Sequence, residues 1–102
     1  MNQNDIRVRL LLSMQRALLG MIYPSVRAIA VGFDQLKKLK VIYYLDREPV
    51  EDDYESISEL TTEVIADIDF QEVEELCIYS QDPISKLDGL NSWVYIRKEF
   101  LM

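Results

Sequence analysis

The feature that most constrains the fold is a change of hydrophobic periodicity that occurs twice along the chain. Residues 4–22 and 51–69 repeat apolar side chains every three to four positions, which is typical of an amphipathic helix. Each stretch is followed by two short segments whose side chains alternate and are rich in β-branched and aromatic residues, as in strands. These four segments are 26–33, 38–45, 74–80 and 92–99.

The order of elements is therefore α-β-β-α-β-β, with each pair of strands expected to form a hairpin. We expect an α+β fold, a two-layer sandwich in which two helices pack on a four-stranded antiparallel sheet. The first hairpin would turn at the polar residues 34–37, and the pattern leaves open which face of the sheet is buried. With 102 residues, close to the usual size of one domain, residues 1–102 are expected to form a single domain.

The first helix has a polar or small face, formed by Arg9, Ser13, Arg16 and Gly20 at spacings of four, three and four. The opposite side is apolar, and Asn4 or Asp5 is expected to cap the start of this helix. The apolar run 10–22 has 13 residues, too few to span a bilayer. We therefore expect no membrane association and a cytoplasmic location.

Composition narrows the possible functions. The chain has no histidine and one cysteine, Cys77, so it has no His-based catalytic triad, no His-ligated metal site and no internal disulfide. Cys77 lies in an apolar strand and is predicted to be a buried thiol. A Gly-rich phosphate loop and a calcium loop are also absent from the sequence. We expect a protein that is not an enzyme and that carries no cofactor and no metal.

The net charge of −7 conceals an uneven distribution. Residues 1–47 have a balance of +5, and residues 48–102 have a balance of −12. An acidic surface disfavours direct binding of nucleic acid and favours a basic partner. The alternative is that acids and bases of the two halves interleave in space.

Acids also recur at helical spacing. Glu55, Glu59, Glu63 and Asp67 are four residues apart and stack on one side of a helix, and no Lys or Arg occurs from 48 to 85. This pattern predicts a docking surface for a basic partner; the alternative is an ordinary solvated face. The candidate binding residues are Glu48, Asp52, Asp53, Tyr54, Glu55, Glu59, Glu63, Asp67, Asp82 and Asp88.

Two further features add to this prediction. The connection 81–91 is longer than a usual hairpin loop, and long loops in compact domains are often functional. Tyr43 and Tyr44 point to opposite faces of their strand, so one of them is a candidate interface anchor, with core packing as the alternative.

Four segments of the chain resemble small bacterial immunity proteins of contact-dependent growth inhibition and related polymorphic toxin systems. They are LLLSMQRALLGMIYPSVRAIAVGFD (10–34), TTEVIADI (61–68), EELCI (74–78) and WVYIRKE (93–99). The resemblance implies a cytoplasmic protein that binds a cognate toxin domain and blocks it without chemistry of its own. Many such toxins are nucleases with basic surfaces, and the resemblance supplies no binding motif.

Together these features predict an immunity protein that occludes the basic surface of a toxin, most simply a nuclease acting on RNA. Helix 51–69, its acidic lead-in and the 82–88 loop would form the contact. The alternative is a non-catalytic regulatory or adaptor module that binds another cytoplasmic protein. A small enzyme is a third possibility, disfavoured because no acid–base group with a near-neutral pKa is visible.

Overall fold

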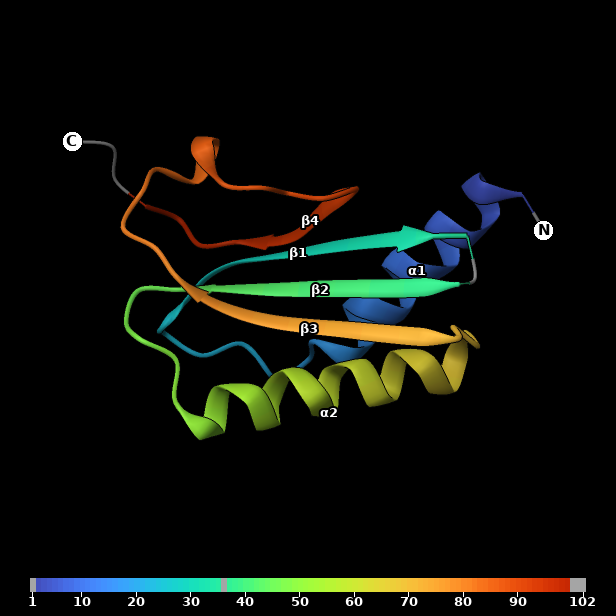
Figure 1. Ribbon diagram of the computed structural model, residues 1–102, viewed down its shortest axis with the longest axis horizontal. Helices are drawn as coiled ribbons and strands as arrows, with labels where there is room; N and C mark the ends of the chain where they lie inside the picture. Colours follow the sequence, from blue (N-terminus) through green and yellow to red (C-terminus); the bar gives the residue numbers. More distant parts are fainter. Residues whose placement is uncertain (1, 36, 100–102) are drawn as a thin grey trace.

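The computed structural model describes residues 2–35 and 37–99 and confirms the α+β class, with two helices and four strands (Figure 1). The elements follow the predicted order, with one 3₁₀ turn added between the last two strands. They are α1 (Gln3–Ala17), β1 (Val26–Asp34), β2 (Lys38–Leu45), α2 (Glu51–Asp67), β3 (Glu72–Tyr79), η1 (Ile84–Lys86) and β4 (Ser92–Ile96).

The sheet is mixed, which corrects the prediction of a fully antiparallel sheet. Strand order is β3-β2-β1-β4. The β1–β2 hairpin is present as predicted, although its turn includes Leu36, which lies outside the described residues. The expected second hairpin was wrong, because β3 pairs in parallel with β2 and β4 pairs with β1 at the opposite edge (Figure 1).

The length of α2 explains the parallel pair. A helix of 17 residues spans roughly 25 Å, about the length of the eight-residue strand β2. The helix therefore returns the chain to the end at which β2 began, and β3 starts there and runs in the same direction. This is the usual helical crossover between parallel strands.

The first helix ends earlier than its apolar pattern suggested. Leu18 is the C-cap residue, and Gly20 adopts a positive φ of 76°, which suits a chain leaving a helix. At the other end the cap is Asn2, whose Oδ1 accepts the Asp5 backbone N–H at 2.9 Å, so the prediction of Asn4 or Asp5 as cap was wrong.

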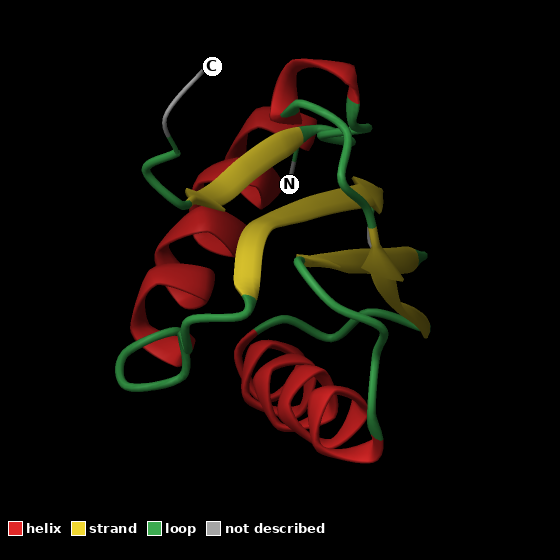
Figure 2. Ribbon diagram, turned by 90° about the vertical axis from the view of Figure 1, so that its left-hand side faces the viewer, coloured by secondary structure: helices red, strands yellow, loops and turns green. Residues whose placement is uncertain are grey.

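Each face of the sheet has its own cover (Figure 2). Both helices lie on one face, where Leu10 and Met14 of α1 and Leu60 of α2 join the main core with Ile29 and other inward residues. On the other face lies a smaller cluster built on Ala28, Ala30, Ile42 and Tyr44. The segment between β3 and β4 covers that cluster, with contributions from Ile84, Leu87 and Leu90.

The second face is thus covered by the long connection, whereas the sequence pattern had left open which face of the sheet is buried. The Tyr44 hydroxyl donates to the Asp88 carbonyl oxygen at 2.8 Å, and the ring centroids of Tyr44 and Trp93 are 5.8 Å apart. Tyr43 is buried in the main core. The two tyrosines lie on opposite faces, as predicted, and both are packed inside the molecule.

Candidate functional site

The solvent-facing side of α2 is an uninterrupted row of carboxylates. Glu51, Glu55, Glu59 and Glu63 are spaced four residues apart and all are exposed, with Asp52 beside them. We call these five residues the acidic ridge. Ser58 and Thr62 lie between the glutamates and, with three of them, line a shallow hollow on the helix surface. Glu51 was missed as a site residue, although its spacing from Glu55 was visible in the sequence.

Within the described residues, the carboxylates of the acidic ridge form no ion pair. The basic first half of the chain does pair with acids of the second half, in Arg16–Asp67, Arg27–Glu99, Lys38–Glu74 and Arg47–Asp53. For those acids, the charges of the two halves of the chain do interleave in space, which was the alternative to a docking surface. Among residues 2–35 and 37–99, however, the ion pairs with Lys or Arg include no ridge carboxylate, so the ridge keeps five negative charges on one face of one helix.

Asp67 continues the four-residue spacing but is already engaged. Its Oδ2 accepts hydrogen bonds from Ser13 Oγ and from Arg16, both at 2.7 Å, and its carbonyl accepts one from Arg9 at 3.1 Å. These contacts lower the pKa of Asp67, with the Ser13 hydrogen bond as the largest cause. The polar face of α1 is thus turned toward the end of α2, where Asp67 joins the two helices.

Asp53 is buried, so it lies away from the exposed surface to which the sequence had assigned it. Its Oδ2 accepts from Arg47 at 2.6 Å and from the Val50 backbone N–H at 2.8 Å. Its Oδ1 accepts from the Tyr23 hydroxyl at 2.6 Å and from Arg47 at 3.1 Å. The carboxylate holds the first turn of α2 against the segment that follows α1, which is a structural role.

This arrangement makes stability dependent on pH in the acidic range. The Arg47 hydrogen bond, followed by those from Tyr23 and Val50, lowers the pKa of Asp53 from 3.8 to about 2. The contribution of the carboxylate is complete above the unfolded value of 3.8 and is lost as the pH falls toward 2. A shift of this size corresponds to roughly 2 kcal/mol.

We therefore expect the free energy of unfolding to fall between about pH 5 and pH 2. Urea titrations at several pH values measure this fall. The variant Asp53→Asn, which cannot titrate at this position, is expected to show a flatter profile over the same range. An unchanged profile in that variant would assign the acid sensitivity to other carboxylates.

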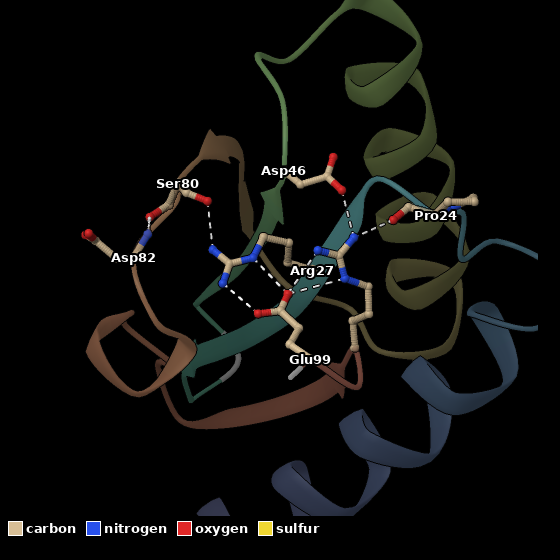
Figure 3. A network of polar contacts seen from close by, with 7 residues as sticks. Pro24, Arg27, Asp46, Ser80, Asp82 and Glu99 are labelled. Atoms are coloured by element: carbon tan, nitrogen blue, oxygen red, sulfur yellow. Dashed lines mark hydrogen bonds and ion pairs between the residues drawn. The ribbon is translucent and has the colours of Figure 1, made fainter. Parts of the chain in front are cut away.

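Asp82 and Asp88 lie in the connection that covers the other face of the sheet, so the structure does not join them to the acidic ridge. Asp88 Oδ1 accepts the Leu90 N–H at 2.8 Å and closes a local turn. Asp82 lies two residues after Ser80, and its N–H donates to Ser80 Oγ at 3.1 Å (Figure 3). The single contact surface expected from α2 and the 82–88 loop is therefore two separate surfaces.

Asp82 borders a network that ties the ends of the strands together (Figure 3). The buried Arg27 makes two hydrogen bonds to the Glu99 carboxylate, at 2.8 and 2.9 Å, and a third to the Ser80 carbonyl at 2.7 Å. Arg97 also bonds to Glu99 and pairs with Asp46 at 2.8 Å. The pKa of Glu99 is lowered, chiefly by the Arg27 hydrogen bond.

The remaining candidate binding residues, Glu48 and Tyr54, lie near the start of α2. Glu48 is exposed in the lead-in to α2, and Tyr54 is about half exposed on the first turn of α2, next to the acidic ridge. Cys77 is buried as predicted, and burial raises the pKa of its thiol to about 11, so it stays protonated at neutral pH.

Neither a metal site nor a membrane span is found in the described part of the chain. Its Asp, Glu and Cys side chains form no group of three or more that could hold a metal ion. None of its helices has the length and apolar character needed to cross a bilayer.

The comparison with known families gives one match. A family model described as MafI2 immunity protein covers residues 7–99, which is most of the chain. No curated protein sequence matches the chain significantly. The matched range includes both helices and all four strands, apart from the first residues of α1.

Proposed function

The chain belongs to the MafI2 immunity protein family, and we propose that it neutralises its cognate toxin by placing the acidic ridge of α2 on a basic, substrate-binding surface of that toxin. The toxin is proposed to be a nuclease, most simply one that acts on RNA, and the encounter to take place in the cytoplasm. The observation that carries this proposal is the row of exposed carboxylates that form no ion pair with a Lys or Arg of the described residues.

The physical reason for choosing a nuclease is the match of charge and spacing. Residues four apart on a helix are about 6 Å from one another, close to the spacing of phosphates along a single strand. Carboxylates in such a row can accept hydrogen bonds from the Lys and Arg side chains that would otherwise hold substrate phosphates. Like charges in this arrangement cost α2 a few tenths of a kcal/mol per pair, and a basic partner relieves that repulsion.

The half-exposed ring of Tyr54 lies next to the charges and is proposed as an anchor. The charged residues would mainly accelerate the encounter, whereas a desolvated ring would slow dissociation. The proposed mechanism is occlusion, in which the protein occupies the substrate site without chemical conversion.

Replacing Glu55, Glu59 and Glu63 together by Gln tests the ridge. We expect the association rate with the toxin to fall about tenfold at low salt and its salt dependence to become shallower, because steering by charge is lost. Stopped-flow or surface-based kinetics at several salt concentrations measure both quantities. A matched control removes three exposed acids elsewhere, with Asp34→Asn, Glu72→Gln and Asp82→Asn. An equal loss in that control would mean that net charge alone matters, against the proposal.

Co-expression tests the immunity function itself. Cells that produce the toxin encoded immediately upstream are expected to survive when this chain is produced with it, and to keep their RNA intact. Death despite a folded, well-expressed protein would contradict neutralisation of that toxin. If the toxin produced alone damages membranes and leaves nucleic acid intact, the nuclease assignment is contradicted.

A further inference from the structure

The outward face of α1 carries exposed apolar side chains that the core does not use. Val8, Leu12 and Leu19 are 48%, 55% and 79% exposed, and Gln15 is exposed between the last two. Positions 8, 12, 15 and 19 have the spacing of one helical stripe, which continues into the turn after α1. This stripe lies opposite the buried stripe of Leu10, Met14 and Ala17. The polar face read from the sequence is instead turned toward α2, through Ser13 and Arg16.

Beside this stripe runs a groove with a volume of about 760 Å³, between α1 and the end of α2. Its apolar lining comes from Leu12, Leu19 and Ile68, and its polar lining includes Arg16 and Asp67. Exposed apolar surface that forms a groove with a polar rim is typical of a protein interaction site, whereas single exposed leucines need no explanation.

The stripe and the acidic ridge belong to one continuous surface. α1 and α2 lie side by side on the same face of the sheet, and Asp67 connects them through its bonds to Ser13 and Arg16. Because Asp67 pairs with Arg16, the junction between the two features is an ion pair on this shared surface. A partner that covers the ridge toward its C-terminal end would therefore reach Leu12 and Leu19.

The exposed surface of α2 alone is smaller than the contact area of a usual stable complex. A helix of 17 residues exposes a strip of roughly 25 by 10 Å, which is about 250 Å². A specific protein–protein contact usually buries about 800 Å² on each partner. Charges at the rim of a contact contribute little affinity, whereas desolvated apolar anchors near its centre contribute most of it.

We propose that the toxin also contacts the outward face of α1, so that Leu12 and Leu19 are the apolar anchors of the complex and the acidic ridge flanks them. This inference rests on the proposed function. It implies that the toxin has an apolar patch at the margin of its basic surface, where it can enter the groove between the helices.

Charge favours the toxin over a second copy of the chain as the occupant. Each chain has a net charge of −7, and the acidic ridge lies on the same layer as the apolar stripe. Two copies of the chain, each with this net charge, repel one another. A basic partner is attracted by the ridge, and its apolar margin fits the groove, whose lining also carries Arg9 and Arg16 beside Asp67.

The test is the double variant Leu12→Gln and Leu19→Gln, with Val73→Thr and Ile96→Thr as the control. The control removes exposed apolar side chains from the edge strands β3 and β4. We expect the α1 variant to weaken toxin binding about 100-fold through faster dissociation, with the association rate and its salt dependence almost unchanged. The control variant is expected to bind like the parent protein.

The outcomes separate this inference from the proposed function. Loss of affinity in the α1 variant, with fast association retained, supports the inference even if the ridge variant associates normally. Unchanged affinity in a folded α1 variant overturns the inference but leaves the role of the ridge intact. Sedimentation of the protein alone provides a second check, because a dimer that the α1 variant abolishes would assign this face to a second copy, against the proposal.

Discussion

Asp53→Asn is expected to destabilise the protein by about 3 to 4 kcal/mol, of which about 2 come from the lost carboxylate charge and about 1 to 2 from a buried donor left without an acceptor. The carboxylate is buried and accepts four hydrogen bonds, from Arg47 twice, Tyr23 and Val50. An amide of the same shape would direct its NH₂ group at one or more of these donors. The first turn of α2 would then lose its attachment to the segment that follows α1.

The neighbouring residue provides the control. Asp52 lies one position earlier on α2 and is exposed, so Asp52→Asn is expected to change stability by less than about 0.5 kcal/mol. Urea unfolding at neutral pH measures both, and the midpoint is expected to shift without a change in slope. Equal midpoints for the two variants would contradict the structural role of Asp53 and return it to the candidate binding surface.

Glu99→Gln is expected to be the second most damaging change, at about 2 to 4 kcal/mol, because it leaves Arg27 charged and buried without its carboxylate. Arg27 donates twice to Glu99, whereas Arg97 keeps its pair with Asp46 when Glu99 is changed. The expected loss is smaller than for Asp53 because the Glu99 side chain is about one-quarter exposed. Glu99 lies after β4, so this bond attaches the following segment to β1.

A double variant shows whether the stability lost in Glu99→Gln comes from the unpaired charge of Arg27 or from any disturbance of this site. The double variant Arg27→Met, Glu99→Leu removes both charges, and we expect it to recover part of the stability lost in Glu99→Gln. Thermal or urea unfolding of the two variants, with the exposed change Glu48→Gln as a reference, gives the comparison. A double variant less stable than Glu99→Gln would contradict the assignment of the loss to the unpaired Arg27.

Most of the secondary structure was predictable because its signal is local. The residues of β2 and the start of α2 were predicted correctly, since alternation and helical spacing depend on neighbours in the chain. The direction of β3 was not predicted, because it depends on how the length of α2 matches that of β2, which is a relation between whole elements rather than between neighbouring residues. The end of α1 was misplaced because apolar residues continue past Gly20, where the backbone turns.

The candidate site was predictable only in part. Spacing alone identified the carboxylates on the outer side of α2, because residues four apart share a helix face wherever the helix lies. It did not distinguish Asp53 and Asp67 from them, because their partners Arg47 and Arg16 come from other elements. It also missed Leu12 and Leu19, because an apolar residue shows its exposure only once the packing of its helix is known.

The sequence by itself determined the class of elements, their order and the four-residue row of acids, all of which depend on side chains close together in the chain. Only the tertiary structure decided which acids stay exposed. Desolvation and ion pairing act between residues that folding brings together. Asp53 is therefore buried and paired with Arg47, and Asp67 is paired with Arg16 between the two helices. The same packing separated Asp82 and Asp88 from α2, because the long connection crosses to the other face of the sheet.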